Sequence, residues 1–592
     1  MEPTEGPGAP APGESDQPGA PFESERGREA RLAARRKRRR LGLAAIVCVG
    51  VAFATLIQSF SWNQTSHYDL IRALNQEKTT ITPYQSNTGD KVEYPKYSGT
   101  FYSARAPGLA LFALPFYDAL NLVHAESWTR AHVAPPNHPG DEMIYLIGLW
   151  ANVLPGMLLL LLVFSVANRF EPGYGAATAV VVGLGTLVLP LSTLLFSHVF
   201  TAFLGFAAFW LMLRERDGPP SLLLLGLAGL AMGYSVTSEY PLFLVAVVLG
   251  LFLLSRRDSL SVGGVARRAG AYVLGGVVGI IPLLLYNHYA FHSWTHLAYA
   301  NVEKQKTGFF GIGAPSLRVL STLLFDSRGL LTISPVLIMG AVGTVMLYRR
   351  GRRAEALTIA GICLCYLTYN SGYYLPFGGG FMGPRFLTTM IPFLACPLGL
   401  ALKRFPGPTL TLAGASIALT VIATVTHPLV GYEPETVIWG RLLDQGLLQP
   451  TIATAYGLDR GWSSIWVFLL PATAGLVLAT AGTRRVKLTA AGAGWGVLVL
   501  LAWALFAALA PHLLGIDHAG LESIFKAGDD TALKTVPGRA HSAYPLDKVV
   551  LIAAAAGLLA LGAFGLMRNQ PRRPPRARNA TTPPCTEPAL SG

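Results

Sequence analysis

The sequence predicts an all-α, polytopic integral membrane protein. Of its 592 residues, 52% are hydrophobic and only 14% are charged, and the mean hydropathy is +0.43. A soluble globular protein does not tolerate such a composition. Apolar runs of roughly 20 residues, enough to span the hydrocarbon core of a bilayer, recur along most of the chain. Basic residues gather in the tails and in the short loops between these runs. Together these observations exclude a soluble enzyme.

The N-terminal 40 residues precede the first apolar run. They begin with Pro, Gly, Glu and Ser and end in a basic run over 35–40, a composition that cannot bury a core. We therefore expect a disordered, basic cytoplasmic tail over 1–40. The apolar run at 41–60 is too long for a signal peptide and lacks a small-residue cleavage site, so we expect an uncleaved first helix.

About 14 transmembrane helices are expected in all. After the first, they are predicted at 142–167, 174–195, 198–214, 221–237, 239–255, 266–289, 331–348, 355–374, 384–402, 408–427, 464–481, 488–510 and 548–568. With this register the basic loops and both tails fall on one side, the cytoplasmic side by the positive-inside rule. The net charge of +14 is therefore a signal of topology, and no nucleic-acid partner is expected.

The apolar segment 107–123 cannot cross without inverting every later loop. We therefore expect an interfacial helix outside the membrane, while a real crossing compensated elsewhere is the alternative. The external side then carries loops at 61–141, 290–330, 428–463 and 511–547. The predicted division of the chain is a membrane module at 41–402 that includes the first external loop, C-terminal helices at 403–570, and a cytoplasmic tail at 571–592.

Ionisable side chains gather at the external face, from which Lys and Arg are normally excluded. In the first loop they alternate with tyrosines, a mixture that suits an anionic, partly apolar ligand. Further along, His198 lies in a tight hairpin, and Glu239 is expected at the start of a helix. Arg328 and Arg385 each follow a loop segment. The candidates are His67, Asp69, Asp90, Lys91, Tyr102 and Arg105 in the first loop, and then His198, Glu239, Arg328 and Arg385.

Several motifs occur in an order that resembles a known superfamily. An acidic residue ends the segment His67-Tyr68-Asp69 near the start of the first external loop. The segment Gly99-Thr-Phe-Tyr-Ser-Ala-Arg-Ala-Pro-Gly108 leads into the juxtamembrane helix, and Gly-Pro-Arg-Phe at 383–386 precedes an apolar helix. Over about 41–400 the chain resembles the GT-C superfamily of polyprenyl-phosphate-sugar-dependent glycosyltransferases, especially the branch of the aminoarabinose transferases and protein O-mannosyltransferases.

The resemblance implies a GT-C-like fold and an inverting glycosyltransferase in the cell inner (plasma) membrane. A hexosyl or pentosyl group would pass from a polyprenyl-phosphate-linked donor to an acceptor hydroxyl of a glycan, lipid or protein, on the extracytoplasmic face. Such a transfer needs a carboxylate to take the acceptor proton, for which Asp69 is the candidate and Asp90 the alternative. It also needs cations for the departing phosphate: first Arg105 and Arg385, then Lys91 and Arg328.

The remaining candidate substrate contacts are His198, Glu239 and Tyr102. Leu70 follows Asp69, where one branch of the family carries a second acidic residue, so a second acidic contact to a metal or an acceptor is in doubt. No cofactor is certain, and a divalent cation is left open. Simpler structural roles are also open: a helix cap for Asp69 or Glu239, an interhelical hydrogen bond for His198, snorkelling for Arg105, and pairing of Arg328 with Asp326.

Two other functions stay open at this point. A secondary transporter or flippase of lipid-linked glycan would be expected to show inverted repeats, and none is visible in the sequence. An envelope polymer ligase would also act on lipid-linked glycan outside the cell, without depending on a carboxylate early in the chain.

Overall fold

The computed structural model describes residues 25–133, 141–255, 261–302, 305, 308–429, 435–513 and 548–566. Over this part of the chain the secondary structure is helical, apart from isolated bridges and one antiparallel two-stranded sheet formed by β1 (Lys91–Glu93) and β2 (Phe101–Ser103). The predicted all-α class is confirmed. The predictions for residues 1–24, 514–547 and 571–592 lie outside the described residues.

The first helix corrects one prediction. It is α1 (Glu25–Thr55), so residues 25–40 are helical although we expected them to be disordered. Arg, Lys and Ala have high helix propensity, and extending an existing helix avoids the cost of a new nucleus. The helix also ends before residue 60. The segment after it runs beside residues 450–451, where the Ile57 amide donates to the Pro450 carbonyl at 2.9 Å.

Every predicted crossing contains helix, and some consist of consecutive helical elements, although Met143–Phe170 is one unbroken helix. The 142–167 crossing is α5 (Met143–Gly148), the π-helix η2 (Leu149–Val153) and α6 (Leu154–Phe170) in succession. The 174–195 crossing is α7 (Gly175–Leu184) and α8 (Val188–Ser192). The 384–402 crossing is η5 (Arg385–Met390), α17 (Ile391–Ala395) and α18 (Leu398–Arg404). The others are α9 (Ser197–Asp217), α10 (Leu222–Ser238), α11 (Leu242–Leu254), α12 (Val262–Phe291), α15 (Val336–Arg349), α16 (Arg353–Ser371), α19 (Pro406–Thr426), α22 (Trp466–Gly482), α23 (Ala490–Leu513) and α25 (Lys548–Leu566).

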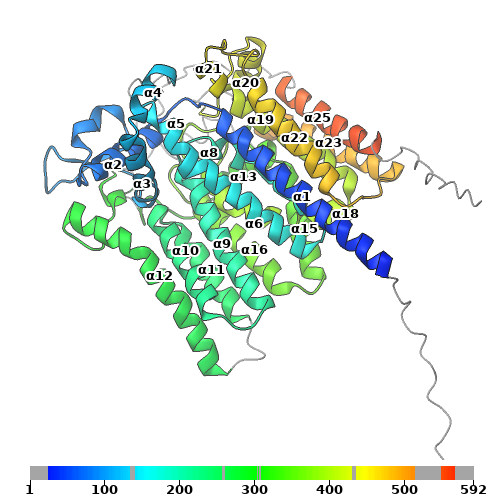
Figure 1. The fold of residues 1–592 in the computed structure, drawn as a ribbon, viewed down its shortest axis with the longest axis horizontal. Coiled ribbons are helices and arrows are strands. Elements are labelled where there is room, and N and C mark those ends of the chain that lie inside the picture. The colour runs from blue at the N-terminus through cyan, green and yellow to red at the C-terminus, as the bar shows by residue number, and fades with distance from the viewer. Residues whose placement is uncertain are drawn as a thin grey trace, which may run out of the picture.

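These helices make the chain a multi-pass membrane protein. Among the described residues, five helices are long and apolar enough to cross a bilayer, and the number rises to eight if each of three bent pairs is one span. Five further apolar helices are 10–17 residues long, among them α10 and α11. The bundle is drawn in Figure 1.

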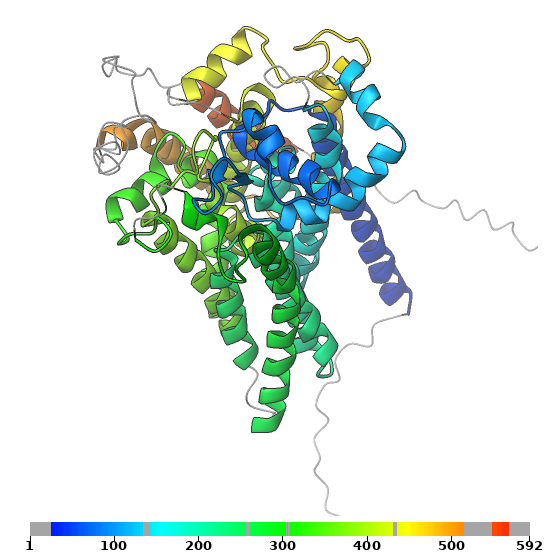
Figure 2. The ribbon, with the colours of Figure 1, turned by 90° about the vertical axis from the view of Figure 1, so that its left-hand side faces the viewer.

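Short elements gather at one end of the bundle (Figures 1 and 2). Those seen there are α2 (Trp62–Asn75), α3 (Gly108–Leu122), α4 (Ala125–His132), α20 (Glu435–Asp444) and α21 (Ile452–Ala455). The other short elements are η1 (Thr82–Asn87), η3 (Ala298–Asn301), α13 (Leu317–Phe325) and α14 (Leu330–Ile333). Helix α3 bends by 90° into α4 and packs against α2, and the Tyr234 hydroxyl near the end of α10 donates to the Gly108 carbonyl at 3.0 Å. The interfacial position of α3 stays a prediction.

The opposite end of the bundle carries basic residues in ion pairs. Arg169 pairs with Asp217 and Glu355, and Arg268 pairs with Glu215 at 2.6 Å. Glu171 accepts from two further cations, Arg350 and Lys403, each at 2.6 Å. Because α9 runs from Ser197 to Asp217 and contains 21 residues, its two ends lie about 30 Å apart. The predicted cytoplasmic loops and the predicted site residues therefore lie at opposite ends.

Candidate functional site

Helix α2 presents two different faces to its surroundings. Residues three or four apart share a face of a helix, so Asn63 and His67 lie on one side while Asp69 and Arg72 lie on another. The Ser66 hydroxyl donates to the Asp90 carbonyl at 2.6 Å and lies 2.8 Å from the Ser103 hydroxyl, which fixes α2 against β1 and β2. The helix therefore separates two groups of ionisable residues.

The first group joins most of the predicted site residues. We call it the charge cluster, and it consists of His67, Asp90, Arg105, His198, Glu239 and Arg385. Arg105 pairs with Asp90, and His198 pairs with Glu239. With its side-chain oxygen turned toward Arg105, Asn63 accepts from that guanidinium at 3.2 Å. The charges of Arg105, His198 and Arg385 all act on His67, which places the cluster around one centre.

Arg385 is the cation of this cluster that makes no ion pair with a described residue. It begins η5, its residue is only 6% exposed, and its Cζ lies 5.0 Å and 5.5 Å from the ring centroids of Phe196 and Phe386. Within the described part of the chain it makes no ion pair, and its buried Nε has no hydrogen-bond partner. A buried cation without a partner is costly, so a guanidinium kept here is suited to an anion supplied by a ligand.

The glycine-rich segment before η5 makes room for this side chain. Gly378 has φ +78°, and a Cβ at that position would lie 2.4 Å from the Arg385 Nε. Only glycine adopts this backbone conformation at no steric cost and also leaves space for the guanidinium.

His67 is buried in the same cluster without a partner. Its residue is 1% exposed, and neither ring nitrogen makes a hydrogen bond to the described residues. Burial, followed by the charges of Arg105, His198 and Arg385, lowers the pKa of His67 to about 3. The ring is therefore neutral at physiological pH, with one nitrogen able to donate and the other able to accept.

Asp69, the predicted base, belongs to the second group on α2. It pairs with Arg72 on its own helix and accepts from Asn87 at 3.4 Å, and Arg72 also lies 3.6 Å from Asp141. The Asp69 side chain is 0% exposed, and burial, opposed by Arg72, raises its pKa to about 6. The Asp90 side chain is 27% exposed. Asp69 is held by Arg72 on the face of α2 away from the charge cluster, whereas Asp90 belongs to that cluster, so this geometry favours the alternative base, Asp90.

Three other predicted residues lie outside the charge cluster. Lys91 donates to the Gln85 carbonyl at 2.5 Å, and its Nζ lies 5.2 Å from the Phe101 ring. Tyr102 is 5% exposed and packs 4.9 Å from the Phe291 ring at the end of α12. Arg328 lies over Phe377, with 4.7 Å from its Cζ to the ring centroid.

The position of Glu239 corrects another prediction. We expected Glu239 to start a helix, but it is the C-cap of α10, and α11 begins only at Leu242. A carboxylate gains nothing from the negative end of a helix dipole, so capping does not explain it. It is held by His198 in the first turn of α9 and by the Ser197 hydroxyl, which donates at 2.6 Å.

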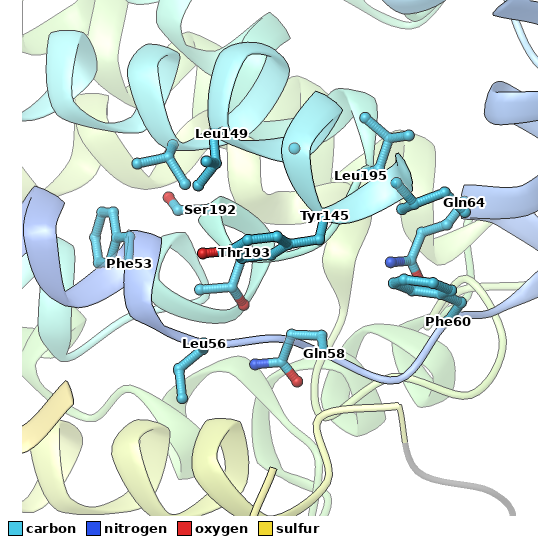
Figure 3. A pocket seen from close by; sticks show the side chains of 13 residues that line it. Phe53, Leu56, Gln58, Phe60, Gln64, Tyr145, Leu149, Ser192, Thr193 and Leu195 are labelled. Carbon is cyan, nitrogen blue, oxygen red and sulfur yellow. The ribbon is translucent and has the colours of Figure 1, made fainter. Parts of the chain in front are cut away.

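A small pocket lies between the end of α1, the α5–η2 junction and α8, and Figure 3 shows side chains that line it. The Gln64 side chain enters it from α2, next to Asn63, and Leu195 lines it beside Phe196, which packs on Arg385. No residue predicted from the sequence as a site residue lines this pocket.

Sequence reasoning named His67 among the residues of the first loop without giving it a role, and it did not single out Asn63. The spacing i, i+4 would have placed both on one face, but the segment 61–141 was expected to be a loop, and no helix was assigned to it. Among the described residues no group of three His, Cys, Asp or Glu could hold a metal ion. Dependence on a divalent cation stays a prediction.

Comparisons with known proteins return structures but no sequence family. No protein-family model matches the chain, and no curated protein matches it. Among solved structures, ArnT from Cupriavidus metallidurans bound to undecaprenyl phosphate is 14% identical, with a TM-score of 0.40, covering 78% of this chain and 80% of that one. The same protein in the apo state is 18% identical with a TM-score of 0.40, covering 75% of this chain and 76% of that one.

A second kind of structure is also similar. The Archaeoglobus fulgidus oligosaccharyltransferase in the apo form is 12% identical, with a TM-score of 0.38, and the alignment covers 87% of this chain and 64% of that one.

Proposed function

We propose that this protein is a membrane glycosyltransferase that moves a sugar from a polyprenyl-phosphate-linked donor to an acceptor hydroxyl. The observation that carries the proposal is Arg385, a buried guanidinium with no anionic partner among the described residues, in a cluster at the end of a membrane bundle. A lipid-linked phosphate supplies the missing negative charge, and its lipid chain accounts for the position of the cluster among apolar helices. Arginine also matches the geometry of phosphate oxygens.

Asp90 is the general base in this proposal. The acceptor oxygen attacks the anomeric carbon of the donor while Asp90 takes its proton, and the bond between that carbon and the phosphate oxygen breaks with inversion. The electron pair leaves with the polyprenyl phosphate. Its developing negative charge is stabilised by Arg385, and Arg105 holds Asp90 in position.

We place the reaction on the extracytoplasmic face. The charge cluster lies at the opposite end of α9 from the basic ion pairs around Arg169, and the positive-inside rule assigns the latter end to the cytoplasm. The inner membrane follows from the resemblance, and the identity of the acceptor is left to experiment.

The test compares two carboxylates and two guanidiniums in purified protein reconstituted with donor and acceptor extracts of the host membrane. Arg385→Met should lower sugar transfer about 100-fold or more, because one preorganised charge at the leaving group is worth that much. Asp90→Asn should lower it about 100- to 10,000-fold, and Asp69→Asn should retain transfer. Arg318→Met, an exposed arginine of α13, is the matched control.

Either of two results would overturn parts of this proposal. Full transfer by Arg385→Met would show that Arg385 does not bind the donor phosphate. Loss of transfer in Asp69→Asn, with activity retained in Asp90→Asn, would show that Asp69 is the base. Lipid-linked glycan crossing the membrane at the wild-type rate in the Asp90→Asn protein would favour the transporter reading. Transfer measured with and without EDTA tests the divalent cation.

A further inference from the structure

We propose that His67 is a substrate-binding residue that hydrogen-bonds a hydroxyl group of the sugar carried by the donor. The inference rests on the proposed function and adds to it a contact to the sugar itself. His67 belongs to the segment His67-Tyr68-Asp69, but the family resemblance gives a role only to Asp69.

The first step is the absence of any protein partner for a deeply buried polar ring. His67 is 1% exposed, and both of its ring nitrogens are without a hydrogen bond among the described residues. Buried polar groups are nearly always hydrogen-bonded, and leaving one unpaired costs free energy. On the same face of α2, one turn earlier, Asn63 is held by Arg105. His67 therefore lies in the charge cluster, ready for a ligand group.

The second step concerns which group can approach the ring. Two guanidiniums, Arg105 and Arg385, act electrostatically on His67, so a cationic group of a ligand is repelled from this position. An anionic group is drawn to the unpaired Arg385 instead. The ring stays neutral, which leaves one donor and one acceptor nitrogen. A hydroxyl also donates and accepts, so a neutral hydroxylated ligand matches it.

The third step is distance along the donor. In a polyprenyl-phosphate sugar the phosphate oxygen is bonded directly to the anomeric carbon, so a phosphate on Arg385 places the sugar within one ring width of that guanidinium. Tyrosine hydroxyls surround the same centre: Arg105 and Arg385 both act on Tyr299, and Tyr373 accepts a hydrogen bond from Gln305 at 2.8 Å. His67, Tyr299 and Tyr373 are thus polar groups of the region that holds the two guanidiniums.

The experiment separates binding of the lipid phosphate from binding of the sugar. The full chain in detergent micelles is titrated with undecaprenyl phosphate and with undecaprenyl phosphate linked to glucose, galactose, mannose or arabinose. We expect the wild type to bind at least one sugar-linked lipid more tightly than the bare phosphate. His67→Phe should weaken that complex roughly 5- to 10-fold, the worth of one hydrogen bond, and leave the affinity for undecaprenyl phosphate unchanged.

His67→Asn, which keeps a donor and an acceptor, should recover part of the loss. His132→Phe, at an exposed position of α4, is the matched control. Three results would overturn the inference: no gain from any of the four sugars in the wild type, an equal loss for the bare and the sugar-linked lipid in His67→Phe, or a change confined to the KM of the acceptor. Undecaprenyl phosphate binding that survives in Arg385→Met would instead refute the proposed function.

Discussion

At the residue scale, the group that the proposed reaction does not use consists of two acids, Asp69 on α2 and Asp141 before α5, that share the guanidinium of Arg72. Arg72 pairs with Asp69 and lies 3.6 Å from Asp141, and its Cζ lies 4.4 Å from the Tyr68 ring and 4.2 Å from the Tyr84 ring. Burial raises the pKa of Asp69 to about 6 and that of Asp141 to about 7, against the opposing charge of Arg72. Arg72 cannot fully compensate two buried carboxylates.

This arrangement predicts how stability depends on pH. Because both folded-state pKa values lie above the ordinary 3.8 of aspartate, the folded protein binds more protons than the unfolded chain between about pH 4 and 7. The contribution of these two groups to stability is therefore largest at low pH and falls as pH rises through that window. Removing one charge should relieve the cost only at the upper end.

We expect Asp69→Asn to gain thermal stability relative to wild type as pH rises from 4 to 7. The difference in Tm in detergent should increase by roughly 1–3 °C across the window. Asp118→Asn, on the exposed side of α3 where it accepts from Asn75, should show no such trend. A Tm difference for Asp69→Asn that stays constant with pH would contradict the assignment.

At the element scale, the helical crossings were predictable and the site was predictable only in part. Each apolar run carries its own signal, because a bilayer forces the backbone to satisfy its hydrogen bonds within a helix. The site depends on contacts between segments far apart in the chain, such as Arg105 with Asp90 and His198 with Glu239. Asp69 lies on one face of α2, and Asp90 lies in the cluster against the other face. The sequence predicted a loop here, and without a helix the face on which Asp69 lies could not be predicted.

The packing of α10 on α12 gives the prediction at this scale. A Cβ added at Gly233 of α10 would lie 2.1 Å from the Gly276 carbonyl oxygen of α12, so glycine allows the two backbones to touch. Gly233→Ala should force the helices apart, destabilise the protein by about 1–3 kcal/mol and displace Glu239 at the end of α10. Both the midpoint of thermal unfolding and the rate of sugar transfer should fall.

Gly270 is the matched control, because it lies on α12 with no atom within 4 Å of its Cβ position. Gly270→Ala should leave transfer unchanged and raise stability by up to about 1 kcal/mol through helix propensity. Equal behaviour of the two variants would show that the close approach of α10 and α12 is not required.

At the scale of the whole molecule, the two ends of the bundle differ in chemistry. One end holds basic residues in ion pairs, half-exposed at Arg350 and Lys403 and buried at Arg268, and the other holds two guanidiniums and two imidazoles that are largely buried around α2 and η5. Cations near the cytoplasmic surface interact with anionic lipid head groups, whereas buried cations at the other end need a specific ligand. The orientation of the chain therefore decides on which side of the membrane the proposed reaction occurs.

Labelling of single cysteines in cells tests this orientation. Lys96→Cys lies at an exposed position of the β1–β2 connection, and Arg349→Cys lies at the exposed end of α15. A membrane-impermeant maleimide should label Lys96→Cys in intact cells, or in spheroplasts where an outer membrane blocks the reagent, and should label Arg349→Cys only after the inner membrane is permeabilised. The Cys585→Ser protein is the background, since Cys48, Cys363, Cys365 and Cys396 lie in apolar segments. The reverse pattern would place the charge cluster on the cytoplasmic side. The donor phosphate would then have to lie in the cytoplasmic leaflet. The proposed face would be wrong even if Arg385 binds the phosphate.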